Sequence, residues 1–297
     1  MGSALNIAVD IIVGVTGVSG TFLNTIIVVL NFSFWRDVTT TESYNKILFF
    51  IGLINLLLQG QIMFNAIFQS FDFYVSSNNL LLYMITLGFT LISTNIWNTT
   101  WLSIFCCVRL VNCSHIFFVK IQVKFFSSLP LLLVGSVLLC AITNLPLLLT
   151  NIRDIPLNTT DFSESNFRFI VNYYCITLSS LFGFIIPFFM TFVSIGLSVT
   201  TLLRHIRRMG SSDSHLTSVQ LQGHYRAVRT MVIRVFLDFL FFFSTFLGIS
   251  FPFILDSITR FVVQIIFLTY PTCQAFILIF GNPKLKGAVY GLFKALR

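Results

Sequence analysis

The sequence predicts an all-α integral membrane protein: a bundle of seven transmembrane helices followed by a short amphipathic C-terminal helix. Hydrophobic residues make up 56% of the 297 residues and charged residues only 9%, whereas a soluble domain carries about 25% charged residues. Apolar runs long enough to cross a bilayer recur along the whole chain. The Lys and Arg residues lie at the ends of these runs, where they orient transmembrane helices.

Seven runs reach the roughly 20 mainly apolar residues that a spanning helix needs. The expected helices are Ile7–Leu30, Asn45–Ser70, Leu80–Val108, Phe125–Thr150, Tyr173–Leu203, Val228–Phe251 and Phe261–Phe280. Since no long polar stretch separates them, we expect a single domain over residues 1–297. Residues 283–297 alternate apolar and basic residues at helical spacing, which predicts an amphipathic helix lying on the inner leaflet.

The distribution of cations predicts the orientation in the plasma membrane. With the N-terminus outside and the C-terminus in the cytoplasm, 15 of the 18 Lys and Arg residues lie on the cytoplasmic side, as the positive-inside rule requires. Because these cations flank apolar runs, the net charge of +8 indicates contact with membrane lipid rather than with nucleic acid.

The same topology selects one glycosylation site. Four Asn-x-Ser/Thr sequences occur, at Asn31, Asn98, Asn112 and Asn158. Only Asn158 lies in an expected external loop, so we expect it alone to carry a glycan.

A bundle of this kind can transmit a signal inward or move a solute across the membrane. A transporter usually carries several ionisable groups along its path, but one pair lies well inside a helix here: Arg234 and Asp238, four residues apart on one face. It is either a local pair that neutralises two costly charges or a latch that changes partner when its helix moves. No catalytic motif or metal-ligand spacing is present, so we expect no enzyme activity, no cofactor and no metal.

Two prolines fall inside expected helices. Pro187 and Pro271 each remove one backbone hydrogen bond and can kink the helix. The kinks either produce simple curvature or act as hinges for the inner helix ends.

Several segments share a more specific pattern. They are Asn24 with Asn31 and Trp35, the segment Trp97–Ser114, Pro187 with the helix ending Leu203–Met209, His224–Thr230, and Pro271 with Gly281–Lys286. Together they resemble the bitter taste receptor family, the type 2 taste receptors among the G-protein-coupled receptors. Departures at Asn55, Cys106 and Gln274 make the chain similar to a divergent member.

The resemblance implies a ligand site in the external half of the bundle. The residues at the matching positions are Phe89, Ile92, Ser93, Ser180, Phe184, Phe246, Gln264 and Phe267. Such a site is an apolar, aromatic cleft with a few polar groups, typical of small-molecule pockets. Helix packing alone is the alternative role for each residue. Gln264 is singled out because an amide in an apolar helix needs a hydrogen-bond partner.

The resemblance also implies that the inner face couples to a heterotrimeric G protein when a small-molecule agonist binds. The matching cations are Arg109, His205, His224, Arg229 and Lys286. Anchoring to anionic lipid is the alternative role for them. Two other functions stay open at this point: a pheromone receptor of the related vomeronasal type 1 family, and a membrane transporter or channel.

Overall fold

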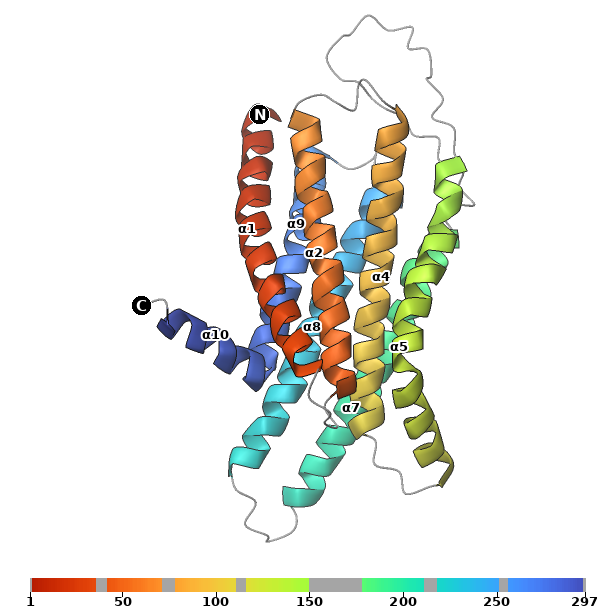
Figure 1. The fold of residues 1–297 in the computed structure, drawn as a ribbon, viewed down its shortest axis with the longest axis vertical. Coiled ribbons are helices and arrows are strands. Elements are labelled where there is room, and N and C mark those ends of the chain that lie inside the picture. The colour runs from red at the N-terminus through yellow and green to blue at the C-terminus, as the bar shows by residue number, and fades with distance from the viewer. Residues whose placement is uncertain are drawn as a thin grey trace, which may run out of the picture.

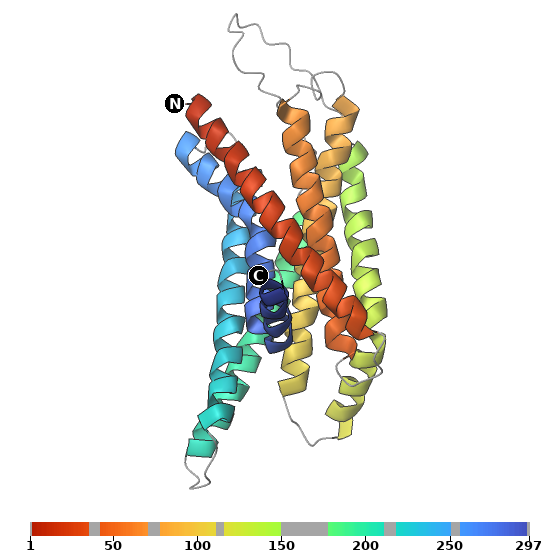
Figure 2. The same cartoon turned by 60° about the vertical axis from the view of Figure 1, so that its left-hand side comes forward.

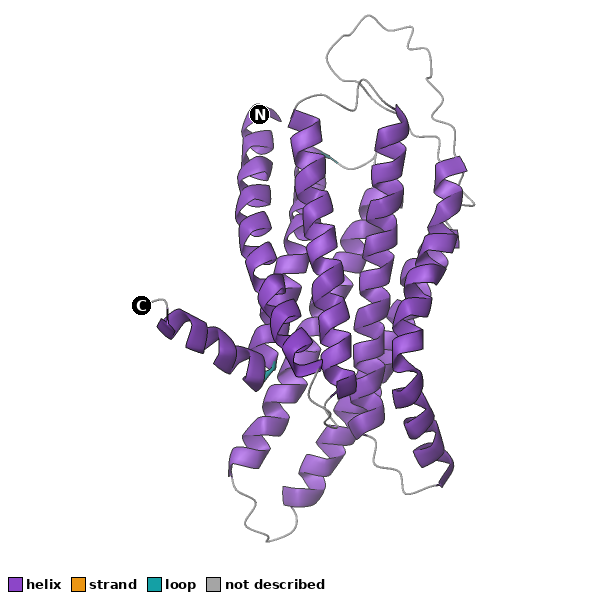
Figure 3. Cartoon of the chain, in the orientation of Figure 1, coloured by secondary structure: helices purple, strands orange, loops and turns teal. Residues whose placement is uncertain are grey.

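The computed structural model describes residues 2–35, 42–70, 78–110, 116–149, 178–210, 218–250 and 256–295, and all regular structure in these ranges is helical. Seven long helices run side by side there, and a shorter helix leaves the bundle sideways (Figures 1 and 3). The predicted fold class, a helical membrane bundle with a C-terminal helix, is confirmed.

The long helices are α1 (Gly2–Trp35), α2 (Glu42–Ser70), α4 (Asn78–Leu110), α5 (Ile116–Asn144), α7 (Ile186–Gly210), α8 (Ser218–Ser250) and α9 (Ser257–Gly281), and the short one is α10 (Pro283–Ala295). A 3₁₀ turn, Leu145–Leu149, continues α5, and a π-helical turn, Leu181–Ile185, leads into α7. We call the end where α1 and α4 begin the outer end and the end where α10 leaves the inner end, following the predicted orientation.

Several helices are longer than their apolar runs. α4 and α8 have 33 residues each, about 50 Å at 1.5 Å per residue, against a hydrocarbon core of about 30 Å. α8 begins at Ser218 rather than at Val228 because Gln220, Gln222 and Arg226 are good helix formers that continue the helix into water.

Among the described residues, five helices are apolar enough to cross a membrane by length and composition, over Ile7–Ser33, Ser43–Phe68, Gln122–Leu148, Leu178–Thr201 and Ile258–Gly281. α4 and α8 run alongside them in the bundle (Figure 1). α4 is more polar because it carries a run of buried Ser, Thr and Asn residues, and α8 carries the charged residues Arg234 and Asp238 within its length. Phe236 of α8 is nevertheless 61% exposed on the outside of the bundle, as expected of a side chain that faces lipid.

The helices close into a ring. α1 packs on α2 and α9, α2 on α4, α4 on α7, and α8 on both α7 and α9, while α5 packs outside the ring, mainly on α4. Figure 2 shows α1 inclined against its neighbours. α4 therefore packs on three other long helices, α2, α5 and α7.

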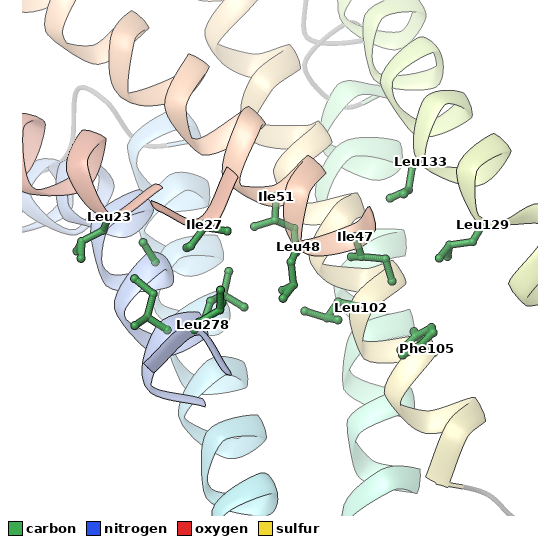
Figure 4. Packing of buried hydrophobic residues seen from close by; sticks show 13 residues of the cluster. Leu23, Ile27, Ile47, Leu48, Ile51, Leu102, Phe105, Leu129, Leu133 and Leu278 are labelled. Carbon is green, nitrogen blue, oxygen red and sulfur yellow. The ribbon is translucent and has the colours of Figure 1, made fainter. Parts of the chain in front are cut away.

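The inner half of the bundle holds a continuous apolar core. It joins Leu23 and Ile27 of α1 with residues of α2, α4, α5 and α9 (Figure 4). Leu285 of α10 is 1% exposed and belongs to the same core, so α10 is docked on the bundle by its apolar face.

The π-helical turn before α7 is stabilised by α4. In this register the N–H of residue i donates to the carbonyl of residue i−5, as Ile186 does to Leu181. The next residue, Pro187, has no N–H, so the carbonyl of Phe182 lacks its helical donor. Trp97 of α4 donates its indole Nε1–H to that carbonyl at 3.0 Å, which satisfies it inside the membrane.

This arrangement predicts different effects for two tryptophans of α4. Trp97→Phe leaves the Phe182 carbonyl without a donor and is expected to lower the free energy of unfolding by about 1 kcal/mol. The matched control is Trp101→Phe, because the buried Nε1 of Trp101 has no hydrogen-bond partner among the described residues. Thermal unfolding of the purified protein in detergent measures both. Equal losses of stability would contradict the role given to Trp97.

Candidate functional site

The outer half of the bundle contains a cluster of apolar and aromatic side chains from α4, the π-helical turn, α8 and α9. Four predicted ligand residues, Phe89, Ile92, Phe184 and Phe267, pack together in it. We call this group, with Phe241, Phe242 and Tyr270, the outer aromatic cluster. The structure thus brings together residues that lie far apart in the sequence.

Ring stacking organises the cluster. Phe241 of α8 stacks on Tyr270 of α9 with 3.8 Å between ring centroids, and on Phe267 with 5.9 Å. Phe242 lies 6.3 Å from Phe184 of the π-helical turn and stacks on Phe188 at 4.9 Å. The rings therefore join α7, α8 and α9 across the middle of the bundle.

Ser93 and Ser180 lie beside the π-helical turn. Ser93 is fully buried against Gly183, where any side chain at position 183 would collide with its hydroxyl. The Ser93 Oγ has no hydrogen-bond partner among the described residues. Ser180 directly precedes the turn and is partly exposed. A buried hydroxyl without a partner is a polar group that a ligand can use.

Two of the predicted ligand residues lie at the edge of this region. Phe246 is 45% exposed and lies next to Phe242 of the cluster, with 6.4 Å between ring centroids. Gln264 is exposed on α9. The Gln264 side chain thus lies at the surface of the bundle, whereas Phe89, Ile92, Phe184 and Phe267 lie in the cluster.

The outer aromatic cluster is closely packed. Beside it lies a cavity of only about 20 Å³, lined in part by Thr99, Thr191, Asp238 and Tyr270. A cavity needs roughly 10–15 Å³ to hold one water molecule, so this space is the size of one water. An occupant larger than a water molecule would therefore have to part the rings.

Below the cluster a chain of amides joins four helices. Asn95 of α4 donates to the Oδ1 of Asn55 of α2 at 2.7 Å, and Asn55 donates to the Oδ1 of Asn24 of α1 at 3.1 Å. Asn24 in turn donates to the carbonyls of Gly20 at 2.9 Å and of Pro271 of α9 at 3.4 Å. We call these three residues the amide chain. Sequence reasoning had identified Asn24 and Asn55 but missed Asn95, for which the signal was an amide within an apolar helix.

The Arg234–Asp238 pair on α8 forms in the structure but is loose. The Arg234 Nε lies 3.9 Å from the Asp238 Oδ2, which is beyond hydrogen-bond distance. The other carboxylate oxygen, Oδ1, accepts a hydrogen bond from the Tyr270 hydroxyl of α9 at 3.0 Å. Gln274 donates to the same hydroxyl at 3.4 Å. Tyr270 is the residue that sequence reasoning missed here, because its role depends on the packing of α8 on α9.

A second, larger cavity of about 220 Å³ lies at the inner end. Arg234 lines it, and α2, α4, α7, α8 and α9 all contribute to its wall. The lining residues are Tyr44, Leu102, Ser103, Cys106, Ile195, Ser198, Thr230, Arg234, Ile277, Leu278 and Gly281. We call this space the inner cavity.

The residues that carry the cations predicted to couple to a partner belong to α4, α7, α8 and α10. Arg109, in the last turn of α4, and Arg229 of α8 are both exposed. Lys286 of α10 is partly buried, with its Nζ 5.7 Å from the ring centre of Tyr290. His205 and His224 lie on α7 and α8, but their side chains are outside the described part of the structure.

The two prolines are buried where helices meet. The carbonyl of Pro187 accepts a hydrogen bond from Thr100 of α4 at 3.1 Å, and that of Pro271 accepts the hydrogen bond from Asn24. Asn158, the predicted glycosylation site, lies outside the described residues.

The amide chain predicts how stability responds to two asparagine substitutions. Asn55→Leu breaks two interhelical hydrogen bonds, so the Asn24 Oδ1 loses its donor and the Asn95 Nδ2 loses its acceptor, and we expect a loss of about 1–2 kcal/mol. Asn98→Leu is the matched control, because both side-chain atoms of Asn98 are buried without a hydrogen-bond partner among the described residues. Denaturation in detergent micelles measures the difference. A larger loss for Asn98→Leu would contradict the role of the amide chain.

Comparison with known proteins adds the family context. The family model described as "Taste receptor protein (TAS2R)" matches residues 1–297. Taste receptor type 2 member 4 of Homo sapiens is 26% identical over 275 residues, which cover 90% of this chain and 90% of the relative. The member 4 receptor of Pongo pygmaeus is 25% identical over 274 residues, with 90% of both chains covered. Taste receptor type 2 member 39 of Homo sapiens is 22% identical over 275 residues, covering 91% of this chain and 81% of the relative.

Proposed function

Since this chain belongs to the type 2 taste receptor family, we propose that it senses small, mainly apolar bitter compounds and signals through a heterotrimeric G protein at its basic inner face. Family membership makes the chain a seven-transmembrane receptor of the plasma membrane. The match over the whole length is the observation that carries the proposal. It favours a bitter taste receptor over a vomeronasal receptor, and a receptor over a transporter or channel.

The outer aromatic cluster is the proposed agonist site. Phe89, Ile92, Phe184 and Phe267 supply an apolar wall, and the Ser93 hydroxyl supplies a buried polar group that lacks a partner among the described residues. Ser180, Phe246 and Gln264 flank this wall on the outer side. Such a combination suits an apolar ligand with one polar function.

The π-helical turn is the proposed point at which the site opens. π-helical turns are rare and occur often at functional sites. Phe184 lies in this turn and is 4% exposed, so a shift of the turn would move an aromatic wall of the site. Pro187 follows the turn by two residues and its carbonyl accepts a hydrogen bond from Thr100 of α4, so movement of the turn would pull on α4.

The route to the inner face is proposed to run along α8 and α9. Tyr270 stacks on Phe241 within the cluster and donates to Asp238, which lies one helical turn from Arg234 on the inner cavity. Parting the rings would therefore disturb the Tyr270–Asp238 hydrogen bond. Arg234 and Asp238 would act as the latch, and Pro187 and Pro271 as hinges that let the inner helix ends move.

The basic inner rim is the proposed docking surface for the G protein. We use this name for Arg109, His205, His224, Arg229 and Lys286. Arg109 and Arg229 are exposed, so they can contact an acidic surface of the partner and speed its association. The same cations would also contact anionic lipid of the inner leaflet.

The agonist site predicts a loss of potency on truncation of the cluster. Phe267→Ala removes a ring that contacts Phe241, and we expect the agonist concentration for half-maximal response to rise roughly 10- to 100-fold, since burial of a Phe side chain is worth about 1.5–3 kcal/mol. Calcium release in cells that express a taste-type G protein, tested first against a panel of bitter compounds, measures the response. Phe276→Ala is the matched control, because Phe276 lies on the same helix and is 43% exposed. Equal shifts in the two variants, at equal surface expression, would place the agonist elsewhere.

The proposed orientation predicts a single glycan. With the N-terminus outside, Asn158→Gln is expected to abolish the mobility shift that glycosidase treatment produces, and Asn112→Gln is expected to leave it intact. Gel electrophoresis of protein from mammalian cells measures both. A shift that depends on Asn112 would reverse the orientation.

A further inference from the structure

The inner cavity combines an apolar wall with one buried cation. Leu102, Ile195 and Leu278 are among its apolar lining residues, and Arg234 is the charged residue of the lining. Arg234 is only 8% exposed. A buried guanidinium is costly unless its N–H groups find acceptors, so its hydrogen bonding decides what this cavity can hold.

Arg234 is left with unused donors. Its Nε and Nη2 are buried without a hydrogen-bond partner among the described residues. The Asp238 Oδ2 lies 3.9 Å away from Nε, close enough to offset charge but not to accept a hydrogen bond. The planar guanidinium can therefore still bind a carboxylate through two parallel N–H donors.

Asp238 is held in place by α9 instead. Its Oδ1 accepts the hydrogen bond of Tyr270, and the Tyr270 ring is packed against Phe241 at 3.8 Å between centroids. Asp238 thus cannot swing to Arg234 without losing this bond. The pair is arranged so that a second carboxylate can approach Arg234 while Asp238 stays where it is.

We propose that Arg234 binds the C-terminal carboxylate of the G protein's α subunit when the end of that chain enters the inner cavity. This inference rests on the proposed function, since it specifies which receptor group recognises the inserted partner. The bound end is a carboxylate, which matches the unused donors, and an apolar last side chain would contact Leu102, Ile195 and Leu278.

Size and charge favour the end of a peptide over a free small molecule. The inner cavity has a volume of about 220 Å³, which is below the roughly 300–1,000 Å³ of pockets for drug-sized ligands. It would accept the last residues of a partner peptide whose remainder stays outside the cavity. The exposed cations Arg109 and Arg229 near the inner end would draw an anionic chain end toward the cavity.

The test compares two peptides that differ in one group. Both copy the C-terminus of the α subunit of a taste-cell G protein, one ending in the free carboxylate and the other in an amide. Fluorescence anisotropy measures their binding to the full-length receptor in lipid nanodiscs with agonist present. For the unmodified receptor we expect the amide to bind roughly 10- to 100-fold more weakly, as expected for hydrogen bonds to a charged group.

Two receptor variants assign the difference to Arg234. In Arg234→Gln the two peptides are expected to bind alike, because the guanidinium that distinguishes them is gone. Arg229→Gln is the matched control: it removes a cation of the basic inner rim, so we expect both peptides to weaken by a similar factor and their ratio to persist. If the ratio collapses in Arg229→Gln but persists in Arg234→Gln, the assignment is wrong.

The peptide pair also tests the proposal when Arg234→Gln does not fold, because equal binding of both peptides to the unmodified receptor overturns it. Agonist-stimulated nucleotide exchange on the intact G protein, measured in parallel, distinguishes a failure of this inference from a failure of the proposed function. If agonists stimulate nucleotide exchange but the acid and amide peptides bind equally well, only the inference about Arg234 is wrong. If no bitter compound stimulates nucleotide exchange, the proposed function is wrong and the inference fails with it.

A free small acid is the remaining occupant to exclude. Cys106 lines the inner cavity and is not disulfide-bonded, so its labelling by a membrane-permeant thiol reagent reports on occupancy. If hexanoate protects Cys106 in the unmodified receptor and not in Arg234→Gln, while the two peptides bind alike, the site takes small carboxylates and the proposal is overturned. Protection of Cys106 by the acid peptide and not by the amide supports it.

Discussion

The bilayer core offers the backbone no water, so each N–H and C=O group within it has to find a partner inside the protein. Helices satisfy this demand along their length, and the structure shows what happens where a helix is interrupted. Pro187 removes one donor from the π-helical turn, and Trp97 of α4 replaces it at the Phe182 carbonyl. A side chain of a neighbouring helix thereby stabilises an irregular turn at the edge of the proposed agonist site.

The same scarcity of partners explains how the helices recognise one another. Lipid tails are as apolar as the helix surfaces, so association depends on close packing and interhelical hydrogen bonds. The amide chain supplies such bonds between α1, α2 and α4, and Asn24 extends it to the carbonyl of Pro271 in α9. Gly183 permits the π-helical turn to approach Ser93 of α4 closely. Hydrogen bonds between polar side chains thus fix how the helices are placed, and apolar side chains fill the space between them.

The two halves of the bundle differ in how closely they are packed. The outer aromatic cluster is closely packed beside a cavity of about 20 Å³, whereas the inner cavity has about 220 Å³ and contains a buried cation. Tyr270 connects them, because its ring stacks in the cluster and its hydroxyl holds Asp238. In the mechanism that we propose, parting the rings near the outer end would therefore change the hydrogen bonds of Asp238 near the inner end.

The seven-helix class, the C-terminal helix and the family resemblance followed from the sequence alone, because apolar length, charge and short motifs are local properties of the chain. The spacing of Arg234 and Asp238 likewise predicted their contact within one helix. Only the tertiary structure decided that Gln264 is exposed, that Asn95 completes the amide chain and that Tyr270 holds Asp238. Each of these depends on which face of one helix meets which face of another. An apolar stretch that can be buried all round carries no periodicity from which that face can be deduced.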